Sequence, residues 1–237
     1  MKDTIKNTEA GAQRDHVMQS YAPPQHPFID VLYTDNDLLV LNKQSGLLSV
    51  PGKLSEHSDC LEARACATYD DPLLVHRLDM ETSGVFIMAR NRNAQRLLGQ
   101  QFERRATHKT YIARVVGMLP TPEGTVDLPL ICDWPNRPKQ MVDHERGKKA
   151  ITHWRVLDVE ANAHGPVSRV ELTPETGRSH QLRVHMLALG NVILGDRLYG
   201  DAITVSMADR LQLHAHKLTV HHPTRQDAVT FEAPMPF

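Results

Sequence analysis

A charged segment enclosed by two apolar runs places the strongest constraint on how this chain can fold. Residues 76–84 read HRLDMETSG and lie between an apolar run at 73–75 and a longer one at 85–89. Because buried strands flank them, Arg77 and Asp79 are costly unless they line a cleft or are paired. The alternative is an ordinary hairpin whose polar residues cap the turn. The segment therefore indicates either a hairpin turn or the wall of a functional cleft.

The segment resembles the signature of the RluA family of pseudouridine synthases, enzymes that modify RNA. Four further elements of this family follow in the family's order and span the chain from about residue 28 to its end. They are NKQSGL at 42–47, HKTY at 108–111, TGRSHQLRVH at 176–185, and LHA at 213–215 with HP at 222–223. Gln44 replaces the family's usual proline, which shapes a turn and carries no chemistry. Five elements in order favour the cleft over the plain hairpin.

Two further segments, residues 128–140 and the N-terminal residues, bear on substrate class and domain organisation. Residues 128–140, LPLICDWPNRPKQ, resemble a short member of the family that acts on both 23S ribosomal RNA and transfer RNA. Larger members carry an S4-like RNA-binding module, but fewer than about thirty polar residues precede the first apolar strand here. We therefore expect a mobile polar tail over residues 1–26, a single pseudouridine synthase catalytic domain over residues 27–237, and no S4-like module.

The composition is that of an ordinary globular domain. The chain is 41% hydrophobic and 23% charged, without a low-complexity block, a repeat or a membrane-length apolar run. Its first residues lack the apolar core of a secretory signal. Three cysteines without a CxxC pair suit a reducing cytosol. We expect the protein to be a cytoplasmic monomer that needs no membrane and no obligatory protein partner.

The formal net charge of −1 is unusual for a protein that binds nucleic acid. An RNA enzyme of this composition must concentrate its basic residues on one face. Residues 137–149 are a candidate for such a face, and a solvated charged loop is the alternative. The basic residues of this segment are Arg137, Lys139, Arg146, Lys148 and Lys149.

Apolar periodicity predicts more strands than helices. Strands are expected at 29–33, 38–41, 111–116, 151–159, 167–172, 211–220 and 228–231, and helices at 61–69, 91–105 and 183–189. Because hairpin-length links dominate, we expect an α+β fold with a mainly antiparallel sheet. The resemblance implies the pseudouridine synthase catalytic fold, a long bent sheet with flanking helices and a central cleft.

The resemblance also implies that Asp79 is the catalytic residue. Pseudouridine formation detaches uracil from C1′, turns it and rejoins it through C5, so it needs no metal, nucleotide or redox cofactor. We expect Arg183 to keep Asp79 ionised by holding it bidentately, and a surface arginine is the alternative. Tyr111 is expected to pack against the flipped uracil and to relay the proton from C5, although strand tyrosines commonly serve only in a core.

A uridine within an RNA loop can reach a buried aspartate only if the enzyme extrudes it. Arg77 lies two residues before Asp79, so on one strand both side chains face the same way and Arg77 can fill the space that the base leaves. A salt bridge to a nearby acid is the alternative. Arg178 and His180 complete the expected RNA-binding set together with Arg137, Lys139, Lys148 and Lys149.

Several functions compete at this point. The leading one is isomerisation of a uridine in a hairpin loop of 23S ribosomal RNA and in the anticodon stem-loop of transfer RNA. A relative with ribosomal RNA as its single substrate and a non-catalytic RNA-binding or folding factor are alternatives, and the presence of Asp79 and Tyr111 favours catalysis. A metal-dependent hydrolase is the third class. His214 with His216, and His221 with His222, lack an accompanying HExxH or Cys/His set, so we expect no metal site.

Overall fold

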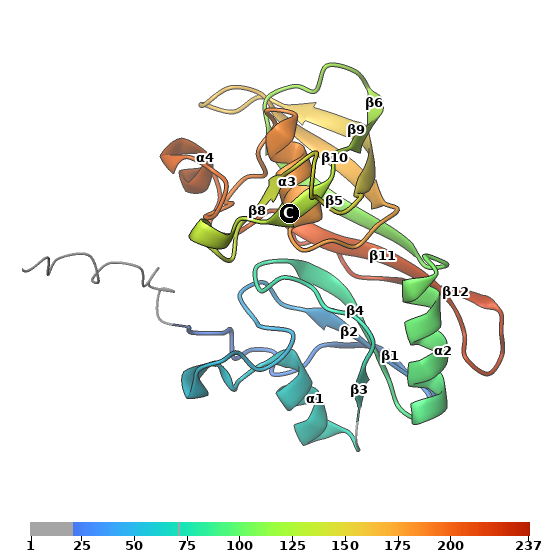
Figure 1. Ribbon diagram of the computed structural model, residues 1–237. Helices are drawn as coiled ribbons and strands as arrows, with labels where there is room; N and C mark the ends of the chain where they lie inside the picture. Colours follow the sequence, from blue (N-terminus) through green and yellow to red (C-terminus); the bar gives the residue numbers. More distant parts are fainter. Residues whose placement is uncertain (1–20, 71) are drawn as a thin grey trace, which may run out of the picture.

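One bent sheet runs through the part of the chain that the computed structural model describes, residues 21–70 and 72–237 (Figure 1). Its central path is β1-β2-β4-β11-β5-β10-β9-β6, with β12 beside β11 and β3 beside β4. The strands of this sheet are β1 (Val31–Thr34), β2 (Leu38–Lys43), β3 (Leu73–Leu74), β4 (Ser83–Ala89), β5 (His108–Val116), β6 (Glu123–Asp127), β9 (Ile151–Glu160), β10 (Val167–Pro174), β11 (Leu213–His221) and β12 (Ala228–Glu232). A separate hairpin joins β7 (Leu130–Cys132) to β8 (Gln140–Val142).

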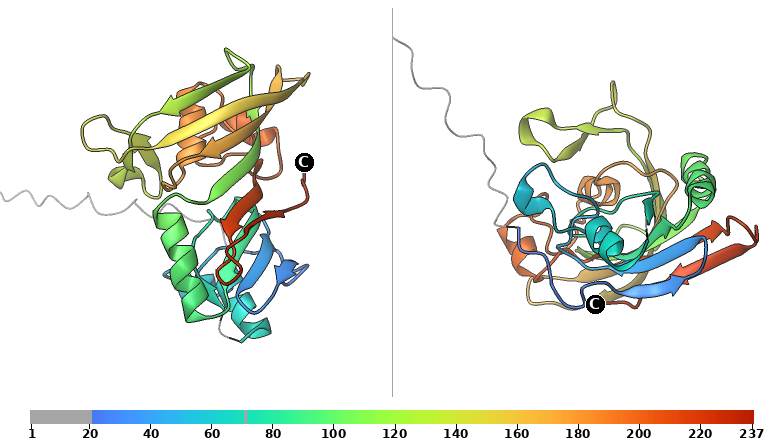
Figure 2. Two further views of the ribbon diagram at one scale, coloured as in Figure 1. Left: turned by 90° about the vertical axis from the view of Figure 1, so that its right-hand side faces the viewer. Right: turned by 90° about the horizontal axis from the view of Figure 1, so that it is seen from below.

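The two halves of the sheet meet where β4 lies parallel to β11. His214 pairs with Ser83 and Ala215 pairs with Gly84, whereas the other strand pairs of the described chain are antiparallel. The left view in Figure 2 shows β1, β2 and β4 on one side of this junction and β6, β9 and β10 on the other. The predicted α+β class with a mainly antiparallel sheet is therefore confirmed.

The helices begin at polar capping residues. The Asn91 side chain accepts a hydrogen bond from the Ala94 N–H (2.8 Å) and starts α2 (Arg92–Glu103), and Asp201 caps α4 (Ala202–Ser206) in the same way. The thiol of Cys60 has this role for α1 (Leu61–Thr68). By contrast, α3 (Gln181–Ala188) follows His180, whose backbone is left-handed with a φ of 54°.

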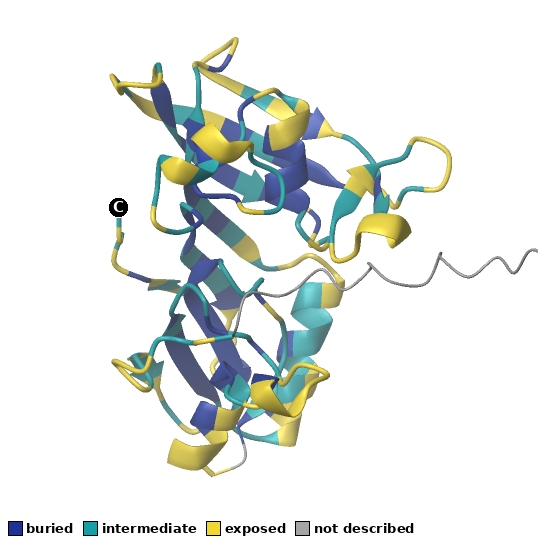
Figure 3. Cartoon of the chain, turned by 90° about the vertical axis from the view of Figure 1, so that its left-hand side faces the viewer, coloured by how far each residue is buried: buried dark blue, intermediate teal, exposed yellow. Residues whose placement is uncertain are grey.

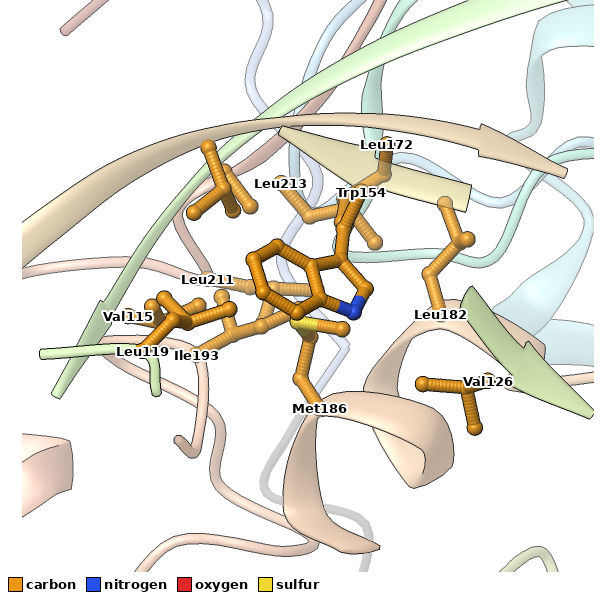
Figure 4. Packing of buried hydrophobic residues seen from close by; sticks show 12 residues of the cluster. Val115, Leu119, Val126, Trp154, Leu172, Leu182, Met186, Ile193, Leu211 and Leu213 are labelled. Atoms are coloured by element: carbon orange, nitrogen blue, oxygen red, sulfur yellow. The ribbon is translucent and has the colours of Figure 1, made fainter. Parts of the chain in front are cut away.

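Apolar alternation on β2 and β4 builds two cores, one on each face of the sheet. Leu38 and Val40 face α2, whereas Leu39 and Leu41 face α1. Burial on both faces explains why these strands read as continuous apolar runs, and Figure 3 shows their buried ribbons. In the other half of the molecule, Trp154 lies at the centre of a third core (Figure 4).

The predicted strands and helices are present, with ends displaced by a few residues. The pattern missed β6, α4 and the β7–β8 hairpin, because each of these helices and strands is only three to five residues long. The basic segment 137–149 contains β8, so it is not purely the charged loop that was the alternative to a basic face. Residues 76–79 are not part of a β-strand, although the sequence placed them on one.

The predicted mobile tail, residues 1–26, lies largely outside the described residues. Its described part contacts the domain: the Tyr21 hydroxyl donates a hydrogen bond to the Asp59 carbonyl (2.7 Å) and accepts one from the Leu48 N–H (3.0 Å). Across the described residues, no helix has both the length and the apolar character required to cross a bilayer.

Gly84 tests the junction between the two halves of the sheet. Its φ is +112°, and a Cβ there would lie 2.2 Å from the carbonyl oxygen of Ala215. We expect Gly84→Ala to lower the free energy of unfolding by about 3 kcal/mol, because the left-handed backbone and the clash add. Urea unfolding measures this change.

Gly99 is the matched control, since it lies on α2 and a Cβ there would meet no atom within 4 Å. Gly99→Ala should raise the free energy of unfolding by up to about 1 kcal/mol. Equal, small effects of the two substitutions would show that the junction tolerates a side chain.

Candidate active site

A cleft of about 760 Å³ lies where the two halves of the sheet meet. Its lining comes from segments around residues 48–50, 76–82, 102–111 and 174–183. Six of the side chains selected from the sequence line this cleft: Arg77, Asp79, Tyr111, Arg178, His180 and Arg183. The structure thus brings together residues that are up to about a hundred positions apart in the chain.

A buried lysine fixes the turn that follows Asp79. Lys43, at the end of β2, is 0% exposed, and its Nζ donates hydrogen bonds to the carbonyls of Gln44 (2.9 Å), Met80 (2.8 Å) and Thr82 (2.8 Å). Burial lowers the pKa of Lys43 to about 7, while the charge of Asp79 opposes this shift. The three carbonyls use all three hydrogens of an ammonium group and therefore favour the charged form.

The residues on either side of Asp79 are held as well. Ser49 Oγ donates a hydrogen bond to the Leu78 carbonyl (2.6 Å), and the Leu78 N–H lies 3.2 Å from the same hydroxyl. On the other side, Ser45 Oγ donates to the Glu81 carbonyl (2.7 Å). Side chains of the 43–49 segment therefore fix the backbone of residues 78–82, and with it the direction of the Asp79 carboxylate.

Arg183 holds a different carboxylate from the one expected. Its Nε and Nη2 lie 2.7 and 2.6 Å from the two carboxylate oxygens of Asp196, and only Nη1 faces Asp79, at 3.8 Å from Oδ2. The expected bidentate pair with Asp79 is therefore wrong. The physical reason is burial: the Asp196 side chain is 1% exposed and needs a full partner, whereas that of Asp79 is 31% exposed.

Asp196 keeps Arg183 charged and orients it. Burial opposes the charge of the guanidinium, but the hydrogen bonds and the charge of Asp196 outweigh it, so that the pKa of Arg183 is raised. Asp196 also accepts hydrogen bonds from the N–H groups of Leu198 (3.0 Å) and Tyr199 (3.1 Å). The third guanidinium nitrogen is thus presented to Asp79 as a fixed positive charge.

His180 presents an N–H toward the same carboxylate. The Tyr199 hydroxyl accepts a hydrogen bond from the Gln140 N–H (2.8 Å) and lies 2.7 Å from His180 Nδ1. Burial raises the pKa of Tyr199 to about 12, so the phenol keeps its hydrogen, and we assign that hydrogen to the bond with Nδ1. The His180 proton then lies on Nε2, 3.9 Å from Asp79 Oδ2. Burial lowers the pKa of His180 and favours this neutral form.

Tyr111 lies on β5 and lines the cleft. Burial raises the pKa of its hydroxyl, and the charge of Asp79 raises it further. The phenol therefore stays protonated at neutral pH. A protonated phenol can relay a proton only by accepting one as it donates its own. This fits the predicted role of Tyr111 as a relay and does not fit a role as an independent base.

Arg77 is exposed at the cleft, on an extended stretch in which Leu78 is buried and Asp79 is half-buried. The alternation expected of a strand thus persists without strand pairing. Among the described residues, Arg77 makes no ion pair with a nearby acid. Its guanidinium is therefore available to a ligand.

The remaining basic residues selected from the sequence, Arg137, Lys139, Lys148 and Lys149, do not line the cleft. They lie on or beside the β7–β8 hairpin. Arg137 stacks on Trp134, with its Cζ 4.7 Å from the ring centroid, and the Trp134 side chain is largely exposed. Arg178 connects this region to the cleft, because its Nε donates a hydrogen bond to the Lys149 carbonyl (3.1 Å).

The histidines that suggested a metal have other partners. His214 Nδ1 lies 2.9 Å from Ser83 Oγ, His216 pairs with Glu232 (3.3 Å), and His222 pairs with Asp35 (2.8 Å). The described residues contain no group of three or more His, Cys, Asp or Glu side chains arranged to hold a metal ion. His76 stacks on Phe86 and Phe102, as a structural residue would.

Sequence reasoning missed Lys43, Asp196 and Tyr199. Asp196 directly follows the apolar stretch at 193–195, which is the same kind of signal that singled out Asp79. Lys43 likewise ends an apolar strand within one of the quoted motifs. Tyr199 offered no such signal, because only the fold brings it to His180.

Comparison with known proteins places these features in one family. Residues 37–188 match the RNA pseudouridylate synthase family. The chain is 53% identical over 220 residues to the dual-specificity RNA pseudouridine synthase RluA of Escherichia coli O6:H1, covering 93% of this chain and 99% of that protein. It is 50% identical to the protein of the same name from Vibrio vulnificus, covering 87% and 83% of the two chains. Human RNA pseudouridylate synthase domain containing 1 has a similar structure, with a TM-score of 0.75 at 30% identity and coverage of 88% and 84%.

The two carboxylates that face Arg183 should respond differently to removal. Asp196→Ala leaves a buried guanidinium without its partner and should lower the free energy of unfolding by about 3–5 kcal/mol. Asp79→Ala removes a half-exposed group at 3.8 Å and should change it by less than about 1 kcal/mol. Urea unfolding of both variants checks this difference, and equal losses would show that Asp79 also stabilises the fold.

Proposed function

This chain belongs to the RluA family of RNA pseudouridine synthases and is an isomerase that acts on RNA, and from that premise we propose that Asp79 is its catalytic carboxylate. The observation that carries the proposal is the geometry around Asp79. Its backbone is fixed by the 43–49 segment, and its side chain opens into the cleft 3.8 Å from the third nitrogen of an otherwise engaged Arg183. The carboxylate is thus held in place while its own oxygens are available to a substrate.

The reaction requires Asp79 in its ionised form. Attack on C1′, attack on C6 and proton abstraction leading to a glycal each begin with a carboxylate, as nucleophile or as base. The bond between N1 and C1′ breaks, the bond between C5 and C1′ forms, and the proton lost from C5 is balanced by one gained at N1. Arg183 Nη1 and the N–H assigned to His180 Nε2 face this carboxylate, at 3.8 and 3.9 Å from Oδ2.

Tyr111 and Arg77 have different roles toward the uracil base. Tyr111 packs against the face of the extruded uracil, and its hydroxyl relays the proton as the C5–H bond breaks. Arg77, exposed at the cleft, fills the space that the uridine leaves in the RNA loop. Arg178 and His180, on the loop before α3, bind the RNA beside the cleft.

We further propose that the chain has two RNA substrates. The similar proteins from Escherichia coli and Vibrio vulnificus bear the name of a dual-specificity enzyme. The two targets are a uridine in a hairpin loop of 23S ribosomal RNA and a uridine in the anticodon stem-loop of transfer RNA. Arg137, Lys139, Lys148 and Lys149 contact phosphates of either stem, and the splayed loop bases provide the discrimination. The enzyme acts as a monomer in the cytoplasm, where both RNAs occur.

Asp79→Asn tests the catalytic assignment. The amide has the shape of the carboxylate but cannot attack or accept a proton, so turnover should fall by at least about 10³-fold with nearly unchanged RNA affinity. Tritium release from RNA that carries 5-tritiated uridine measures turnover, and a gel shift measures binding. Appreciable turnover by homogeneous protein in which no asparagine has deamidated would sink the assignment.

Short hairpins copied from the two RNAs test dual specificity. Both should be modified without the ribosome or the complete transfer RNA, because the cleft reads a remodelled loop. Changes of loop bases next to the target should slow the reaction more than exchanges of stem pairs, which serve as the matched control. Salt should weaken binding of both hairpins with a similar slope. Reaction of the ribosomal hairpin alone would make the chain a single-substrate enzyme.

A further inference from the structure

Two cations on the wall of the cleft have no role in the proposed chemistry. Lys109 lies on β5 two residues before Tyr111, so both side chains face the cleft, which they line together. Arg105 lies on the link between α2 and β5, which can be followed in Figure 1, and lines the same wall. Neither was selected from the sequence.

Lys109 lacks the partners that a half-buried ammonium group ordinarily has. Within residues 21–70 and 72–237 its side chain makes no hydrogen bond and no ion pair. Burial lowers its pKa, and the positive charge of Arg105 lowers it further. Lys43 offers the contrast, because each of its ammonium hydrogens has a carbonyl acceptor. The ammonium of Lys109 is therefore placed where it gains from a bound anion.

Arg105 occupies a backbone conformation that favours glycine. Its φ is 57°, and the Ala106 N–H donates a hydrogen bond to the Gln101 carbonyl (2.8 Å) across it, as at the end of many helices. A side chain other than that of glycine is strained there. An arginine at this position therefore lowers the free energy of unfolding relative to glycine, and it adds a second cation to the wall beside Lys109.

The ammonium of Lys109 lies next to Gly177. A Cβ on Gly177 would lie 3.9 Å from Lys109 Nζ, so the ammonium lies directly beside the loop that carries Arg178. Besides Asp79, two acids line the cleft, Glu103 and Glu175, and the latter lies 2.7 Å from His153. The wall formed by Lys109, Arg105 and Arg178 therefore presents three cations to the cleft.

We propose that Lys109 and Arg105, beside the Gly177–Arg178 loop, bind one backbone phosphate adjacent to the extruded uridine. This inference rests on the proposed function. Uracil packed on Tyr111 places its nucleotide near Lys109, because two residues of strand span about 6.6 Å. RNA supplies a phosphate next to every nucleoside, and a bound phosphate would relieve the repulsion between the two cations. The site would contribute local attraction for RNA in a protein whose net charge is −1.

A scan with neutral linkages identifies the phosphate. Hairpin substrates are prepared with a single methylphosphonate in place of each phosphate near the target uridine, and their affinity is measured by gel shift. For the wild type, we expect one linkage at which loss of charge weakens binding about tenfold. Lys109→Met should weaken binding of the natural hairpin to a similar extent, and the neutral linkage should then cost nothing more. For Lys109→Met, the slope of log affinity against log salt concentration should be smaller by about one released counterion than for the wild type.

Two variants separate this site from a structural role. Arg105→Gly relieves the strained backbone, so it should unfold at a higher urea concentration than the wild type and yet bind RNA more weakly. Arg104→Gln is the matched control, because Arg104 is the exposed neighbour that does not line the cleft. It should keep the wild-type affinity and the wild-type sensitivity to the neutral linkage.

The outcomes distinguish this inference from the proposed function. If the wild type forms pseudouridine but Lys109→Met is as sensitive as the wild type to every neutral linkage, the phosphate site is wrong and the function stands. If the wild type forms no pseudouridine in any RNA, the proposed function itself fails. Unchanged RNA affinity of Arg105→Gly would remove Arg105 from the site.

Discussion

The buried ammonium group of Lys43 organises the backbone around the proposed catalytic site. Burial of a charge is costly, and the cost is offset only where every donor has an acceptor. Here the acceptors are backbone carbonyls, two of which belong to Met80 and Thr82 in the turn after Asp79. The lysine therefore binds backbone carbonyls and makes no hydrogen bond to the carboxylate that we propose as catalytic. It fixes the position of Asp79 and does not neutralise it.

The residues around Asp79 are likewise held in place by groups other than Asp79. Arg183 is oriented by Asp196, and His180 is oriented by Tyr199, so Asp79 is not the group that holds its neighbours in place. Tyr199 also accepts the Gln140 N–H, which connects the β7–β8 hairpin to the cleft. A site built in this way keeps its shape while Asp79 changes its charge or its bonds during a reaction.

The sequence predicted what depends on local pattern and failed where contacts are distant in the chain. The apolar runs of β2 and β4 indicated strands of the sheet correctly, and the charged segment between two apolar runs singled out Asp79, which lines the cleft. The partner of Arg183 was wrong because pairing depends on burial, and no pattern shows that Asp196 is more deeply buried than Asp79. The β7–β8 hairpin was missed because its strands are only three residues long and lie outside the main sheet.

The most direct test of this account is a map of pseudouridines in total RNA from cells that lack the gene and are complemented with the wild type or with Asp79→Asn. The account predicts that the wild type restores one pseudouridine in 23S ribosomal RNA and one in a transfer RNA anticodon stem-loop. The Asp79→Asn protein, present at the same level, should restore neither. Restoration of either site by the variant would contradict the central role of Asp79.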